Sequence, residues 1–139
     1  MTDDVLTVMV YSDDRNVREQ VRMALGRRPA SDLPAVEFVD VATDWAVMDR
    51  LRKGDIDLAI LDGEAVPAGG LGVCRTIKQE VFNSPPVLLL VARPQDHWLA
   101  SWSRADGVVS HPLDPITTAA AAAELLRSGV SAGDVAASS

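Results

Sequence analysis

The chain of 139 residues has a single cysteine, few aromatic residues and no apolar run of membrane-spanning length. Cys74 alone cannot form an internal disulfide, and no group of Cys and His residues has the spacing of a zinc site. We expect Cys74 to be a small buried apolar residue, with a reactive thiol as the less favoured alternative. The N-terminus opens on Asp3 and Asp4 rather than on a basic segment before an apolar stretch. We therefore expect a cytoplasmic protein that is not an integral membrane protein.

Basic residues are also scarce. The 13 Lys and Arg residues face 20 Asp and Glu residues, which gives a formal net charge of -7. Duplex binding depends on Lys and Arg that neutralise phosphates, so nucleic acid is not an expected partner. The composition, 47% hydrophobic and 4% aromatic, lies in the globular range. A chain of this length forms one domain with an ordinary core and needs no disulfide or structural metal.

Short apolar runs alternate with helical patterns along the chain. We expect strands at residues 7–11, 36–41, 57–61, 86–91 and 107–109, several of them continuously apolar as in a sheet covered on both faces. Helices are expected at 14–28, 44–53 and 70–82, less clearly at 94–104, and from Pro115, with Asp114 as cap and Gly129 as end. The alternation predicts an α/β fold of (βα)5 order, doubly wound around a five-stranded parallel sheet. One domain over residues 1–129 and a flexible tail over 130–139 follow.

Polar residues follow the predicted strands at the edge where the carboxyl ends of the strands meet. Ser12, Asp13 and Asp14 follow the first strand, Asp62 the third and His111 the fifth. Ligands and chemistry gather at this edge in parallel sheets, and carboxylates from two strand ends would suit Mg²⁺. The residues alone leave a simpler interpretation open. Asp13 and Asp14 could begin a helix, and Asp62 could belong to an ordinary turn.

Four segments in this order resemble the bacterial response-regulator receiver domain, over nearly the whole chain. They are residues 10–18 (VYSDDRNVR), 57–62 (DLAILD), 70–75 (GLGVCR) and 105–115 (ADGVVSHPLDP). The resemblance implies a flavodoxin-like fold and makes Asp62 the candidate phosphoacceptor. It also implies the Mg²⁺ ligands, which are Asp13, Asp62, the Glu64 carbonyl and, in a helping role, Asp14.

Four positions depart from the family's pattern. Ser12 stands where an acid is usual, Val91 where a Ser or Thr hydroxyl contacts the phosphoryl group, Val108 where an aromatic residue often reports the switch, and His111 where a Lys is usual. A phosphorylated Asp62 would carry roughly two negative charges, which the missing groups would normally offset. We therefore expect Mg²⁺ binding to be weak or absent. We also expect the phosphorylated and unphosphorylated states to differ little. His111 is expected to be a structural strand-end residue or, when nearby carboxylates favour its charged form, a conditional stand-in for the Lys.

Two further features bear on partners. Trp98 and Trp102 are four residues apart and share one side of a short helix. They either pack on the sheet or act as partner-binding anchors, because Trp is enriched at binding hot spots and the resemblance implies dimer or partner contacts on this surface. The stripe of Arg15, Arg18 and Arg22 is expected to be a solvated helix face, with contact to an acidic partner as the alternative.

We predict an atypical, stand-alone receiver domain that acts as a protein-interaction or regulatory module, largely independent of phosphorylation. The alternative is a phosphorylatable single-domain response regulator of a two-component system, with a histidine kinase as partner. A small hydrolase using Asp13, Asp62 and His111 is the least favoured hypothesis, because no Ser or Cys nucleophile has a base in evident reach. No enzymatic activity is expected. A homodimer stays open, as does docking to a larger assembly, since some stand-alone receivers resembling this chain are associated with respiratory complex I.

Overall fold

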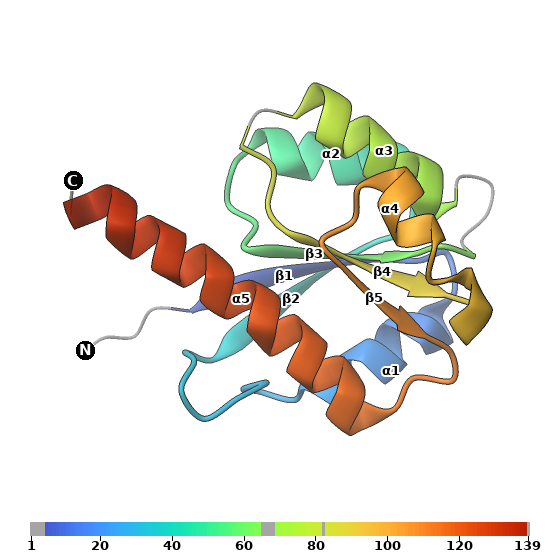
Figure 1. Cartoon of the computed structure of the whole chain (residues 1–139), viewed down its shortest axis with the longest axis horizontal. Helices are drawn as coiled ribbons and strands as arrows, with labels where there is room; N and C mark the ends of the chain where they lie inside the picture. The colour runs from blue at the N-terminus through green and yellow to red at the C-terminus, as the bar shows by residue number, and fades with distance from the viewer. Residues whose placement is uncertain (1–4, 65–68, 82, 139) are drawn as a thin grey trace.

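The protein forms an α/β sandwich around one parallel sheet. The computed structural model describes residues 5–64, 69–81 and 83–138, and the side chains of residues up to 129 (Figure 1). The five strands have the order β2-β1-β3-β4-β5. They are β1 (Leu6–Tyr11), β2 (Val36–Val41), β3 (Leu58–Asp62), β4 (Val87–Val91) and β5 (Gly107–Ser110). The predicted (βα)5 fold is confirmed.

The helices cover both faces of the sheet. They are α1 (Arg15–Leu25), α2 (Asp44–Arg52), α3 (Gly70–Glu80), α4 (Leu99–Ser103) and α5 (Pro115–Ser138), with a short 3-10 turn, η1 (Pro94–Asp96), before α4. Figure 1 shows α1 and α5 below the sheet and α2 and α3 above it, with α4 beside α3. The predicted fourth helix over 94–104 is therefore two short helical pieces.

Alternating strand side chains build two separate cores. Val8 and Val10 of β1 point to one face, where they pack with α1 and α5 residues such as Leu25 and Leu126. Met9 and Tyr11 point to the other face and pack with α2 and α3 residues. Both β3 and β4 are buried along their whole length, which explains their continuously apolar sequences.

Cys74 belongs to the second core, as the sequence predicts. Its side chain is fully buried, and its Sγ atom lies 3.3 Å from the Ser103 carbonyl oxygen, to which the thiol donates. Burial raises the pKa of the Cys74 thiol above its ordinary value. The thiolate, which is the reactive form, is therefore disfavoured in the folded protein.

The ends of the last helix differ in how well the sequence predicts them. Asp114 caps its start by accepting a hydrogen bond from the Thr117 backbone N–H at 2.8 Å, as predicted. The predicted end at Gly129 is wrong, because α5 runs on to Ser138. Gly129 is not among the described residues with positive φ, so it does not adopt the left-handed conformation that ends helices. An interior glycine costs only about 1 kcal/mol relative to alanine, which a long alanine-rich helix tolerates. The flexibility of residues 130–139 stays a prediction.

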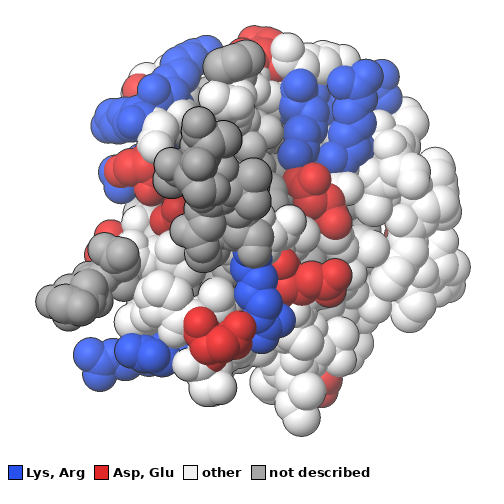
Figure 2. All heavy atoms as spheres, turned by 60° about the vertical axis from the view of Figure 1, so that its left-hand side comes forward, with Lys and Arg blue, Asp and Glu red and all other residues white. Residues whose placement is uncertain are grey.

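Charged side chains of both signs lie near one another on one face of the molecule. Figure 2 shows Lys and Arg side chains in several separate groups on this face, with Asp and Glu side chains among them. Among the described residues, no helix combines the length and the apolar character that crossing a membrane requires.

Candidate functional site

The predicted acidic residues meet in one pocket at the carboxyl end of the sheet. Strand register brings the ends together, since Tyr11 of β1 pairs with Leu61 of β3 and Asp62 pairs with Leu90 of β4. The pocket has a volume of ≈ 370 Å³. It is lined by Asp13, Asp14, Val17, Asp62, Glu64, Ala92 and His111. The structure therefore gathers every acid named from the sequence, together with His111.

Asp62 is the buried acid of this pocket. It is 3% exposed, and its two carboxylate oxygens accept different hydrogen bonds. Oδ2 accepts from the Ser12 hydroxyl at 2.7 Å, and Oδ1 accepts from the Glu64 backbone N–H at 2.9 Å. Burial of a carboxylate is costly unless it is hydrogen-bonded, so these two donors stabilise it. The chain itself thus supplies a donor to each oxygen.

Ser12 is fully buried at the end of β1, and all of its polar groups have partners. Its hydroxyl donates to Asp62 and accepts from the Asp14 backbone N–H at 3.0 Å. The Ser12 N–H donates to the Val41 carbonyl at 3.2 Å, and the Ser12 carbonyl accepts from Nη1 of Arg18 at 2.6 Å. From the sequence, Ser12 is only a residue that stands where the family usually has an acid. In the structure, its hydroxyl is hydrogen-bonded to Asp62.

A divalent cation in this pocket would have to compete with a hydrogen bond that the chain itself supplies. In the described ranges, no three His, Cys, Asp or Glu residues are grouped so that they could hold a metal ion. Mg²⁺ is held by oxygen ligands, and at Asp62 a cation would compete with the Ser12 hydroxyl for Oδ2. The residues predicted to ligate Mg²⁺, Asp13, Asp14, Asp62 and Glu64, line one pocket, and their binding of Mg²⁺ stays a prediction.

The other three residues that depart from the family's pattern lie in β4, in β5 and directly after β5. Val91 ends β4 and is 1% exposed, and Val108 packs against the core that contains Tyr11. His111 follows β5, and its backbone N–H donates to the Val91 carbonyl at 2.8 Å. The half-buried His111 side chain lines the acidic pocket, and the peptide bond to Pro112 is cis. Among the described residues that line this pocket, His111 is the one with a basic side chain.

Tyr11 is a site neighbour that the sequence analysis missed. It is 1% exposed, and burial, followed by the charges of Asp44, Asp13 and Asp62, raises the pKa of its phenol. A signal was present, because Tyr11 directly precedes Ser12 at the end of a buried strand. Its ring places an aromatic group beside the acids on the α2 and α3 side of the sheet.

Two glycines allow the backbone to pack closely behind Asp62. A Cβ atom on Gly63 would lie 2.7 Å from the Leu90 carbonyl oxygen. A Cβ atom on Gly70, the first residue of α3, would lie 2.6 Å from the Asp62 carbonyl oxygen. Both distances are far shorter than a carbon–oxygen contact allows, so only glycine fits. This close approach fixes the start of α3 against the end of β3.

Trp98 and Trp102 lie outside the acidic pocket and are both exposed. Their side chains are 65% and 48% exposed, so neither is a core residue. The guanidinium of Arg75, from α3, lies 4.7 Å from the centre of the Trp102 ring, and its Nη1 donates to the Trp102 carbonyl at 3.2 Å. A third tryptophan, Trp45 on α2, is 71% exposed and was not singled out from the sequence.

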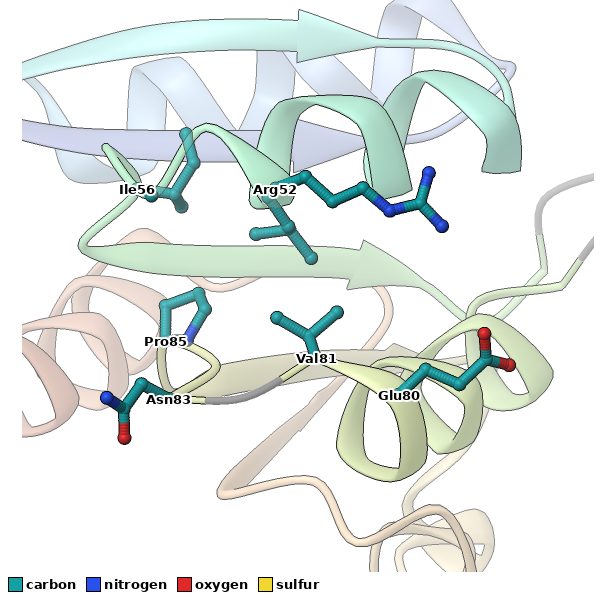
Figure 3. Close-up of a pocket in the computed structure, with 8 residues that line it drawn as sticks. Arg52, Ile56, Glu80, Val81, Asn83 and Pro85 are labelled. Atoms are coloured by element: carbon teal, nitrogen blue, oxygen red, sulfur yellow. The ribbon is translucent and has the colours of Figure 1, made fainter.

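A second pocket lies at the opposite end of the sheet. It has a volume of ≈ 360 Å³ and contains none of the residues predicted to form a site. Figure 3 shows Arg52 and Ile56 on one side of it and Glu80, Val81 and Pro85 on the other. Ile56 and Pro85 precede β3 and β4, so this pocket is at the amino ends of the strands, away from Asp62.

Comparison with known proteins decides the family. Two proteins of Mycobacterium tuberculosis, from strains CDC 1551 and H37Rv, are both named as uncharacterized response regulatory proteins. Each is 50% identical to this chain over 122 residues, which cover 88% of this chain and 92% of the relative. The chain belongs to the response-regulator receiver domains. No family model matches the chain.

Solved receiver domains have the same fold. The signal receiver domain of a putative Luxo repressor protein from Vibrio parahaemolyticus superposes with a TM-score of 0.78 at 16% identity, over 95% of this chain and 98% of that one. A Francisella response-regulator receiver domain gives 0.73 at 13% identity, over 88% and 97%. A chemotaxis response regulator of Vibrio cholerae gives 0.71 at 18% identity, over 88% and 99%. Receiver domains are generally signalling rather than catalytic domains.

Proposed function

We propose that this receiver domain is an atypical, cytoplasmic one that works mainly as a protein-interaction module, largely independently of phosphorylation. The observation that carries the proposal is the exposure of Trp98, the residue directly before α4, and of Trp102 in α4, both away from the acidic pocket. Buried tryptophans would serve the fold, whereas two exposed ones in one short segment offer a large apolar area to a partner.

The state of Asp62 supports independence from phosphorylation. Phosphorylation would bring roughly two negative charges into a pocket that already holds Asp13 and Asp14. It would also replace one of the two hydrogen bonds that the Asp62 carboxylate accepts, from the Ser12 hydroxyl or from the Glu64 backbone N–H. Val91 offers no hydroxyl at the position where the family usually has one, and His111 stands where the family usually has a Lys. A switch needs groups that interact differently with its two states, and this pocket has few of them.

The surface around Trp102 indicates the chemistry of the partner. Arg75 packs over the Trp102 ring and bonds its carbonyl, so the indole is held in place before binding. An ordered anchor loses less side-chain entropy on association. Among the described residues, no carboxylate pairs with Arg75, while the nearby Lys78 is paired with Asp106. A partner that offers an apolar cavity with an acidic group beside it would match this surface.

Substitution of the tryptophans tests the proposal. Trp98→Ala and Trp102→Ala should fold normally, because both side chains are largely exposed. At least one should lower partner affinity about thirtyfold, which corresponds to a hot-spot loss of roughly 2 kcal/mol. The measurement is quantitative pull-down from native cell extract, with folding checked by circular dichroism. Trp45→Ala is the matched control, since Trp45 is also exposed but lies on α2.

Asp62→Ala distinguishes the proposal from its alternative. The interaction module should retain its partner in this variant. Normal binding by both tryptophan variants, with failure of Asp62→Ala, would instead support a phosphorylatable single-domain regulator that acts with a histidine kinase. The shared lining of one pocket by Asp62 and His111 is the observation that favours this alternative.

A further inference from the structure

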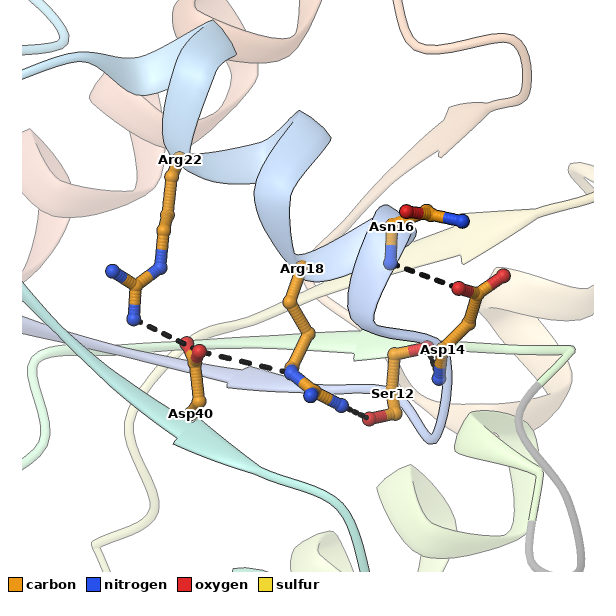
Figure 4. Close-up of polar contacts among 6 residues, drawn as sticks. All are labelled: Ser12, Asp14, Asn16, Arg18, Arg22 and Asp40. Atoms are coloured by element: carbon orange, nitrogen blue, oxygen red, sulfur yellow. Dashed lines mark hydrogen bonds and ion pairs between the residues drawn. The ribbon is translucent and has the colours of Figure 1, made fainter.

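Arg18 connects the acidic pocket to the neighbouring strand. Its Nη1 atom donates to the Ser12 carbonyl at 2.6 Å, and its Nε atom lies 3.7 Å from Oδ2 of Asp40 on β2 (Figure 4). The Arg18 side chain is only 18% exposed. The sequence-based expectation of a solvated arginine stripe is therefore wrong for Arg18, because the residue spans the ends of two strands.

Arg22 provides an internal comparison. Its Nη2 atom lies 2.9 Å from the same Asp40 carboxylate, and its guanidinium lies 5.6 Å from the centre of the Phe38 ring. No contact joins Arg22 to Ser12 among the described residues, and Figure 4 shows it one helical turn away on α1. Both arginines pair with Asp40, but Arg18 alone of the two holds the end of β1.

The contact of Arg18 bears on Asp62 through Ser12. With its carbonyl held by Arg18 and its N–H held by Val41, Ser12 is fixed at the backbone on both sides. Its hydroxyl accepts from the Asp14 N–H, which leaves the hydroxyl proton to be donated to Oδ2 of Asp62. Every hydrogen-bonding group of Ser12 therefore has a defined partner, and the hydroxyl proton is donated to the buried Asp62 carboxylate.

A neutral donor at this place changes what the pocket requires. A hydroxyl satisfies one oxygen of Asp62 without adding charge, whereas a carboxylate at position 12 would add a further negative charge beside Asp62. Adjacent carboxylates repel each other, and a bound divalent cation relieves that repulsion. With serine, the site is stabilised by the chain itself.

We propose that Arg18 is a positioning residue that holds the Ser12 hydroxyl on Asp62, and that this hydroxyl occupies the carboxylate oxygen that a divalent cation would otherwise bind. The inference deepens the phosphorylation-independent part of the proposed function. Its experiment uses the isolated protein and Mg²⁺ alone. The inference can therefore fail while the partner-binding role of Trp98 and Trp102 is supported, and that role can fail while the inference is supported.

The first arm measures Mg²⁺ affinity by titration of ¹⁵N-labelled protein, followed by NMR. Ser12→Ala removes the donor without adding a ligand, and Ser12→Asp removes the donor and adds a ligand. The affinity should rise in the order wild type, Ser12→Ala, Ser12→Asp, with at least about tenfold between the first and the last. Equal affinity of wild type and Ser12→Ala would show that the hydroxyl blocks nothing, and would overturn the proposal.

The second arm tests Arg18 with Arg22 as its control. Arg18→Met should shift the amide signals of Asp14 and Glu64, because their N–H groups donate to the Ser12 hydroxyl and to Asp62, and it should tighten Mg²⁺ binding. Arg22→Met should do neither. Arg18→Lys keeps a cation that can reach the Ser12 carbonyl, so it should show the wild-type signals. This variant also tests the proposal if Arg18→Met proves unstable. The positioning role would be overturned if Arg18→Met and Arg22→Met had the same effects on the amide signals and on Mg²⁺ affinity, or if Arg18→Lys did not show the wild-type signals. Arg18 would then only form an ion pair with Asp40.

Discussion

The Ser12 hydroxyl lies 2.7 Å from Oδ2 of Asp62 and donates a hydrogen bond to it. The two residues are 50 positions apart in the sequence and are brought together by the parallel register of β1 and β3. One of them is the family's candidate phosphoacceptor, and the other replaces an acid that the family usually has. The replacement of an acid by serine at position 12 thus gives the buried Asp62 carboxylate a neutral hydrogen-bond donor.

The first prediction concerns phosphodonor chemistry at Asp62. With Mg²⁺ and acetyl phosphate at neutral pH, the protein should show little stable modification, because the Ser12 hydroxyl already bonds Oδ2 and the positions of the family's usual Lys and Ser or Thr hold His111 and Val91. Intact mass spectrometry measures the result, with Asp62→Asn as the control. A near-complete adduct of about 80 Da that disappears in the control would contradict independence from phosphorylation.

The second prediction concerns the stability that Ser12 contributes. Ser12→Ala leaves Oδ2 of the buried Asp62 without its donor, so the free energy of unfolding should fall by about 1–3 kcal/mol. Urea denaturation measures the change at neutral pH. Ser101→Ala on α4 is the matched control, because Ser101 is exposed, and it should change stability by less than about 0.5 kcal/mol. Equal effects of the two changes would show that the bond adds nothing to stability.

The third prediction concerns the glycine at the start of α3. Gly70→Ala would place a Cβ atom 2.6 Å from the Asp62 carbonyl oxygen, and the resulting displacement should cost roughly 1–3 kcal/mol of unfolding free energy. Gly72→Ala has open space for its Cβ atom and should instead stabilise the helix by about 0.5–1 kcal/mol. Thermal or urea unfolding of the two variants measures the contrast. A stable Gly70→Ala variant would mean that α3 can move away from β3 without loss.

The sequence predicts the sheet well because its signals are local. Continuous apolar runs identify β3 and β4, and strand-end acids identify the pocket that contains Asp62. The capping of α5 by Asp114 is equally local and was predicted, whereas the end of α5 was not, because glycine ends a helix only in a conformation that the sequence does not reveal.

Features that depend on tertiary contacts could not be predicted. The arginine periodicity in α1 suggests a solvated face, but Asp40 from β2 pairs with Arg18 and Arg22. These residues are well separated in the sequence, so no local pattern indicates their contact. Serine at position 12 shows that a usual acid is missing, yet its bond to Asp62 follows only from strand register. Helical spacing predicts that Trp98 and Trp102 share one side of a helix, but Trp98 lies in the turn before α4, and spacing cannot tell a buried side chain from an exposed one.

The last prediction concerns the dependence of stability on pH through Asp114. Hydrogen bonds from the Thr117 side chain and backbone lower the pKa of the Asp114 carboxyl below its ordinary value. A carboxyl with a lowered folded-state pKa stabilises the protein above its unfolded-state pKa of about 3.9, and this contribution is lost as the pH falls below that value. Asp114→Asn keeps an oxygen that can cap the helix but removes the titrating charge.

The difference in unfolding free energy between wild type and Asp114→Asn should therefore favour wild type at neutral pH and shrink as the pH falls below the unfolded-state pKa of about 3.9. Urea unfolding of both proteins at a series of pH values measures this difference. Comparison with the variant removes the effects of other carboxyls, such as Asp32 and Asp96, whose pKa values are lowered by arginine partners in both proteins. A difference that stays constant across the series would show that the charge of Asp114 adds nothing beyond the hydrogen bond, and that asparagine caps α5 equally well at every pH.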